Sequence, residues 1–126
     1  MKRSWIGFGL LVVLLAASVL VTWGMGRIHQ PIVEDLQRAA QAALEEDWEN
    51  GERFFASAQG QWEKWEHLRA CFADHSPVEE IDAAFSELAV YCAARENAAF
   101  AAGCMETGEK VAAVGEAHGL VWWNIL

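Results

Sequence analysis

A run of twenty uncharged residues, Ile6 to Met25, lies near the start of this 126-residue chain. A helix of that length spans roughly 30 Å, at about 1.5 Å per residue, which is the thickness of a bilayer's hydrocarbon core. Trp5 and Trp23 flank the run, at the positions where an aromatic belt lies in the two headgroup layers. The sequence therefore predicts one membrane crossing through residues 6–25.

A cleaved signal peptide is the alternative interpretation of the same run, because it also begins with basic residues. Its best cleavage site is Ala16-Ala17-Ser18, which lies inside the apolar run, and cleavage there would leave Val19 at an apolar new N-terminus. A buried helix of a soluble protein is a third interpretation, but few such helices are apolar on every side. We therefore expect an uncleaved signal anchor.

The basic residues around the run predict its direction. Lys2 and Arg3 precede the span, whereas Arg27 alone follows it closely and is soon succeeded by acidic residues. The positive-inside rule then places residues 1–5 in the cytoplasm. We expect a single-pass protein of the cell membrane whose remaining residues lie outside the cytoplasm.

The part of the chain after the anchor is strongly acidic. Residues 28–126 carry 18 acidic and 6 basic side chains, a formal charge of −12, and the basic residues occur singly. Binding to nucleic acid needs a high density of cations along the phosphate backbone, so nucleic-acid partners are excluded. The expected partners are the lipid bilayer, through residues 6–25, and a membrane protein. No motif indicates a cofactor or a metal.

Three cysteines, Cys71, Cys92 and Cys104, lie among apolar neighbours in a helical pattern, and none forms a CxxC pair. Small buried cysteines fit this pattern best. One disulfide with a free third thiol remains the alternative, because an odd number cannot all pair within the chain.

The region after the anchor is rich in good helix formers and lacks the alternation of strands, so we expect an all-α fold. A linker at 26–31 should lead to helices at 32–47 and 52–72, a third from Pro77, and a fourth at 97–118. Ser76 and Glu79 form a capping box at the start of the third helix. An antiparallel four-helix bundle over 32–118 and an apolar tail at 119–126 follow. Two αα-hairpins resembling tetratricopeptide-type repeats are the alternative.

Aromatic residues recur at helical spacing and predict the core of this bundle. The alternative for Trp62 and Trp65 is an aromatic groove that binds a peptide or a sugar. The expected core aromatics are Phe55, Trp62, Trp65, Phe72, Phe85 and Phe100.

The up-down-up-down order would gather polar and aromatic residues at the end of the bundle that faces the membrane. We interpret this set as a candidate interaction surface, with helix capping and packing as one alternative and a metal or proton-sensing site as another. The residues of the set are His29, Asp74, His75, His118, Trp122, Trp123 and Asn124.

Several short motifs resemble an uncharacterised family of short bacterial single-pass membrane proteins, domain of unknown function family 4363. The resemblance is carried by Trp62 and Trp65, Asp74-His75-Ser76, Ile81-Asp82 and the ending from His118 to Asn124-Ile125-Leu126. It implies a bacterial, exported, single-pass helical protein and supplies no activity, ligand or catalytic residue.

No nucleophile–base arrangement, phosphate-binding loop or dinucleotide motif is present in the sequence, so we do not expect an enzyme. The leading hypothesis is a protein-interaction or accessory module of a membrane complex. A ligand-binding or sensing domain is the alternative, and a structural spacer is a third.

Overall fold

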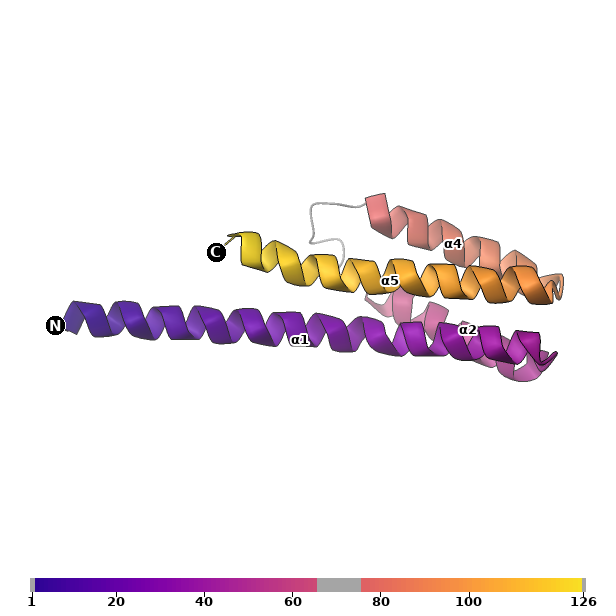
Figure 1. Ribbon diagram of the computed structural model, residues 1–126, viewed down its shortest axis with the longest axis horizontal. Coiled ribbons are helices and arrows are strands. Elements are labelled where there is room, and N and C mark those ends of the chain that lie inside the picture. The colour runs from indigo at the N-terminus through magenta and orange to yellow at the C-terminus, as the bar shows by residue number, and fades with distance from the viewer. Residues whose placement is uncertain (1, 66–75, 126) are drawn as a thin grey trace.

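The computed structural model describes residues 2–65 and 76–125, and within them every regular element is a helix. The side chains of residues 116–125 lie outside the description, as do those of a few residues near position 24. Figure 1 shows the four described helices running lengthwise beside one another. They are α1 (Lys2–Leu44), α2 (Trp48–Lys64), α4 (Ser76–Ala93) and α5 (Asn97–Ile125). The predicted all-α class, with an apolar N-terminal helix followed by a helical bundle, is confirmed.

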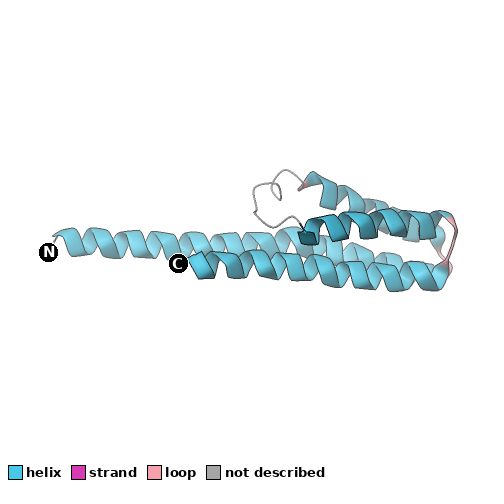
Figure 2. Ribbon diagram, turned by 90° about the horizontal axis from the view of Figure 1, so that it is seen from above, coloured by secondary structure: helices cyan, strands magenta, loops and turns pink. Residues whose placement is uncertain are grey.

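The longest helix, α1, is one uninterrupted element of 43 residues. At about 1.5 Å per residue it is roughly 65 Å long. Its N-terminal part projects beyond the rest of the molecule, and the remainder lies alongside the other helices (Figures 1 and 2). The linker predicted at 26–31 is therefore wrong, because these residues are helical and join the apolar run to the bundle directly.

Helix continuity through this segment has a physical reason. Extending an existing helix adds a hydrogen bond for each residue fixed, whereas starting a new one is costly. His29, Ile32 and Leu36 are all buried and repeat at helical spacing, so packing against the bundle favours the same continuation. Pro31 lies inside the helix on an exposed position, at the cost of one backbone hydrogen bond.

The other helices fold back along the second half of α1. Both α2 and α5 pack against α1, and α4 packs against α5. Figure 2 shows that α5 returns antiparallel to α1, so the chain's two ends lie toward the same side of the molecule. The arrangement is the predicted antiparallel bundle, closed by aromatic contacts between α2 and α4.

Aromatic rings make the centre of the core. Phe55 contacts Phe100 at 5.6 Å and Phe85 at 6.1 Å between ring centroids, and Trp62 stacks on Phe85 at 6.1 Å. Edge-to-face and offset pairs at such distances contribute about 0.5–1.5 kcal/mol each beyond the area they bury. Three helices are therefore fastened to one another by four rings.

The two described turns between helices share one geometry. Glu46 and Arg95 each adopt a left-handed conformation, with φ of 61° and 55°. Around each of them, one N–H bonds three residues back and the next bonds five residues back, as in a Schellman motif. Neither turn contains glycine, so the sequence carried no strong sign of where these helices end.

The helix boundaries around the first turn differ from the prediction. The first helix ends at Leu44, and α2 begins at Trp48 rather than at residue 52. Asp47 is the N-cap, because its side chain accepts a bond from the Asn50 backbone N–H at 3.4 Å. The turn-forming pair Asn50-Gly51 lies inside α2, and a Cβ at Gly51 would be in ordinary contact, at 3.8 Å, with the Ala39 carbonyl oxygen of α1.

The far ends of two predicted helices also differ. The helix α2 ends at Lys64, and the rest of the predicted 52–72 helix lies outside the described residues. By contrast, α5 does not stop at Gly119, and the predicted tail is helical as far as Ile125. Because α5 runs alongside α1 there, a neighbouring helix supports these turns and the local stop signal is overridden.

Replacing Phe100 by alanine should strongly destabilise the bundle. Phe100 is 0% exposed and contacts two rings of α2, those of Trp48 and Phe55, so we expect the free energy of unfolding to fall by about 3–5 kcal/mol. Met105→Ala on the same helix is the matched control, since Met105 is 47% exposed and should change stability by less than about 0.5 kcal/mol. Denaturant unfolding of the full chain in mild detergent, followed by circular dichroism, measures both; equal losses would contradict this core.

Candidate functional site

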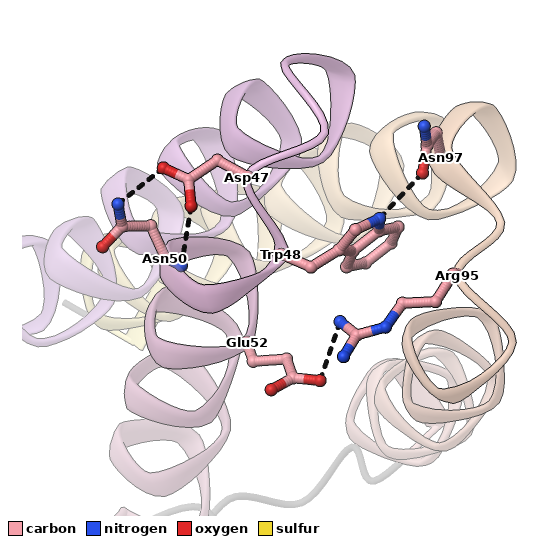
Figure 3. A network of polar contacts seen from close by, with 6 residues as sticks. All are labelled: Asp47, Trp48, Asn50, Glu52, Arg95 and Asn97. Atoms are coloured by element: carbon pink, nitrogen blue, oxygen red, sulfur yellow. Dashed lines mark hydrogen bonds and ion pairs between the residues drawn. The ribbon is translucent and has the colours of Figure 1, made fainter.

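The end of the bundle farthest from the apolar run contains a small polar cluster, shown in Figure 3. The Trp48 indole N–H donates to the Asn97 side-chain oxygen at 3.0 Å. Arg95 pairs with Glu52 at 2.8 Å, and its guanidinium lies 5.1 Å from the centre of the Trp48 ring. We call these four residues the distal cluster. It joins the start of α2 to the start of α5 and to the turn before it.

The distal cluster is structural rather than chemical in character. Both partners of the ion pair are about half exposed, so it contributes at most about 1 kcal/mol. The hydrogen bond and the cation–π contact hold two turns together without leaving a reactive group aimed at solvent. Sequence reasoning missed this cluster, because its partners are far apart in the chain and no local pattern links them.

The aromatic groove considered from the sequence is not open in the structure. Trp62 is 1% exposed and lies in the core, where its indole N–H donates to the Asp82 carboxylate at 2.6 Å. Trp65 is half-buried directly after the end of α2, and Phe72 lies outside the described residues. Of the six expected core aromatics, the four that the structure places in the core are Phe55, Trp62, Phe85 and Phe100.

Only one residue of the predicted interaction surface has a described side chain, and it is not on the surface. His29 is 4% exposed and lies 6.4 Å from Trp62 between ring centroids. A Cβ atom added at Gly115 of α5 would be 3.3 Å from the Cβ and Cγ of His29, so the two helices approach closely there. Asp74 and His75 lie outside the described residues.

The remaining members of that predicted surface belong to α5. Its last turns run along α1 at the end of the bundle that faces the apolar run, as the up-down-up-down order predicted (Figure 1). Their side chains are outside the description, so their contacts stay a prediction. They are His118, Trp122, Trp123 and Asn124.

A groove of about 210 Å³ lies between α4 and α5. Its floor is made of small residues such as Ala84, Ala99 and Gly103, and Glu87 and Glu106 lie along it. A Cβ at Gly103 would be 2.7 Å from a Leu88 methyl carbon, so glycine lets the two helices approach closely beside the groove. The groove therefore combines small apolar walls with polar side chains, which also include Tyr91, Thr107 and Lys110.

Cys92 and Cys104 are buried and neither forms a disulfide. Burial raises the pKa of the Cys104 thiol to about 12 and also raises the pKa of the Cys92 thiol. The thiolate is the nucleophilic form, so both groups are weak nucleophiles at neutral pH. Within the described parts of the chain, no three His, Cys, Asp or Glu side chains lie close enough together to hold a metal ion.

These features define a class of protein: one apolar N-terminal helix continuous with a small all-helical bundle. The chain belongs to the family described as domain of unknown function DUF4363, whose model matches residues 24–125. No curated protein and no solved structure matches the chain. The matched range begins inside α1, so the family domain includes the part of that helix that packs in the bundle.

Replacing Gly115 by valine should destabilise the contact between α1 and α5. The added atoms would meet the base of the His29 side chain, which cannot rotate away, so we expect a loss of about 1–3 kcal/mol. Gly60→Ala in α2 is the matched control. Nothing lies within 4 Å of its added Cβ, so a better helix former should raise stability by about 0.5–1 kcal/mol.

Thermal unfolding of the full chain in detergent compares the two glycine variants. Opposite shifts of the midpoint are expected. A Gly115→Val protein as stable as the wild type would contradict the close approach at His29.

Proposed function

We propose that this protein is a non-enzymatic, single-pass membrane protein whose helical bundle serves as an accessory module of a membrane complex outside the cytoplasm. The observation that carries the proposal is the continuity of α1, which is at once the apolar segment and a core helix of the bundle. A domain joined in this way keeps a fixed height and orientation relative to the bilayer. That property suits a protein that presents a surface to a membrane-bound neighbour.

The exposure of the apolar segment supports an anchor over a core helix. The segment Lys2–Leu20 is long and apolar enough to cross a membrane, yet only 6% of it is buried in the protein. Large side chains such as Trp5 and Ile6 are more than two-thirds exposed. Removing such a surface from water stabilises the inserted state by about 25 cal/mol per Å².

The end of the apolar run has the composition of a headgroup layer. The Arg27 guanidinium lies 3.7 Å from the centre of the Trp23 ring. Arginine and tryptophan are both favoured at the boundary between hydrocarbon and water, and the cation–π contact pairs them there. Together with the basic residues at positions 2 and 3, this pair supports a span that ends near residue 25.

The alternative, a ligand-binding or sensing domain, has less support. Its aromatic site needs an accessible Trp62, and that ring is in the core. Its histidine site needs His29 to face a ligand, and that side chain is packed beneath α5. We therefore retain the accessory module as the function that the geometry favours.

Cysteine labelling in intact cells tests the direction of the anchor. Met105→Cys places a thiol on an exposed position of the bundle, whereas Ser4→Cys places one before the span. In a Cys71→Ala background, a membrane-impermeant maleimide should label the first variant in intact cells and the second only after permeabilisation. Recovery of the protein in the membrane after alkaline carbonate extraction is also expected. Release by carbonate would contradict the anchor.

Photo-crosslinking tests the accessory role. A benzophenone amino acid at Phe8, which is 63% exposed, should give one discrete protein adduct in native membranes when the anchor lies against a partner. The same amino acid at Val90, which is 64% exposed on α4, tests whether the partner also contacts the bundle, where an adduct with the same protein is expected. Adducts confined to lipid at Phe8 and at further positions around the anchor would contradict a membrane-protein partner.

A further inference from the structure

The end of α5 lies beside the apolar half of α1 and not merely beside the bundle. Figures 1 and 2, seen from two perpendicular directions, both show α5 continuing past the start of α4 along the projecting part of α1. Ser18 agrees with this, since it is 5% exposed while its neighbours in the apolar run, such as Val19, are open. Part of the apolar run is therefore covered from one side.

Two close approaches give the register of the antiparallel pair. Gly108 lies beside Val33, where an added Cβ would be 3.8 Å from a methyl carbon, and Gly115 lies beside His29 at 3.3 Å. Each helix rises by about 1.5 Å per residue. In an antiparallel pair, each step to a higher residue number on α5 therefore corresponds to one step to a lower number on α1. Ile125 is then level with α1 to within about one turn of Val19.

Charged residues disappear from the sequence of α5 near the level of Met25, where the apolar run of α1 ends. Glu116 is the last charged residue of the helix and is roughly level with Ile28, beyond the predicted end of the span. Residues 119–125, Gly-Leu-Val-Trp-Trp-Asn-Ile, contain no acid or base and are level with the last third of the run. Trp122 and Trp123 fall near the level of Trp23. The charged residues nearest to the apolar level, Arg27 on α1 and Glu116 on α5, are therefore at about the same level.

We propose that residues 119–125 of α5 insert into the boundary between headgroups and acyl chains beside α1, so that the protein enters the bilayer with two helices. The inference rests on the anchor proposed above and assigns a lipid surface as the partner of this segment. The chain would then contact the membrane through the span in α1 and, to a smaller depth, through the C-terminal end of α5.

The depth of this insertion fits the physics of interfacial helices. The level of Ile125 is about six residues below Met25, which corresponds to roughly 9 Å. That depth is similar to the roughly 5–10 Å to which helices lying flat in the interface bury their apolar face, although α5 enters end-on beside α1. A helix end buried deeper in the hydrocarbon would leave its last backbone carbonyls unsatisfied, so we expect the insertion to stay shallow. The bulk of the acidic bundle stays in water.

Lipid labelling of the purified full chain in nanodiscs tests the proposal. A phosphatidylcholine with a photoactivatable diazirine high on its acyl chain serves as the probe, and trypsin cuts after Arg27 and Lys110 to separate the two membrane segments. Mass spectrometry should find lipid adducts on the peptides 4–27 and 111–126. Peptides 39–53 and 96–110, which include the distal turns, should carry at most about a tenth as much label, since they lie in water.

The pattern of adducts separates the two proposals. Label on 4–27 without label on 111–126 would overturn the insertion of α5 and leave the anchor intact. Absence of label from both peptides would overturn the anchor and the insertion with it. Label on both, localised by fragmentation to residues 119–126, is the expected result.

A variant that introduces negative charge provides the matched test. Trp122→Glu with Trp123→Glu should lower lipid labelling of 111–126 by about tenfold, because a carboxylate is expelled from the acyl boundary. The label on 4–27 should stay unchanged and reports that the protein is still inserted. Val90→Glu, at an exposed position away from the membrane, should change neither peptide. An unchanged label on 111–126 in the double variant would overturn the proposal.

Discussion

The uninterrupted helix α1 is the constraint on which the other elements depend. In a bilayer every backbone N–H and C=O must be satisfied inside the segment, so an apolar span is helical. That helix continues past residue 25 because His29, Ile32 and Leu36 are buried in the bundle at the same helical spacing. One element therefore contains the apolar run and also serves as the template for the fold.

The bundle closes on α1 by contacts of two kinds. Apolar packing of α5, α2 and α4 supplies most of the stability, with Phe55, Phe85 and Phe100 at its centre. The distal cluster fixes how the two turns meet, through the bond from Trp48 to Asn97.

Much of the fold could be predicted from periodicity, because buried residues at helical spacing report which face of each helix packs. The capping-box pattern of Ser76 and Glu79 predicted a helix from Pro77, and α4 begins one residue earlier, at Ser76. The helix ends that were predicted wrongly have a common cause. Asn50-Gly51 and Gly119 have turn-forming residues but lie in helices that pack against α1, whereas the real turns at Glu46 and Arg95 lack glycine. Tertiary packing outweighed local propensity at each of these positions.

The candidate site likewise combines features that neighbouring residues determine with features that depend on contacts between distant segments. The sequence by itself determined the apolar run, its flanking charges, the acidic bundle and the helical class, because each of these is a property of neighbouring residues. Only the tertiary structure decided that no linker separates the apolar run from the bundle, that His29 is buried against Gly115, and that α5 returns alongside the apolar run (Figure 1). These features depend on contacts between distant segments, which the sequence pattern of a single helix does not predict.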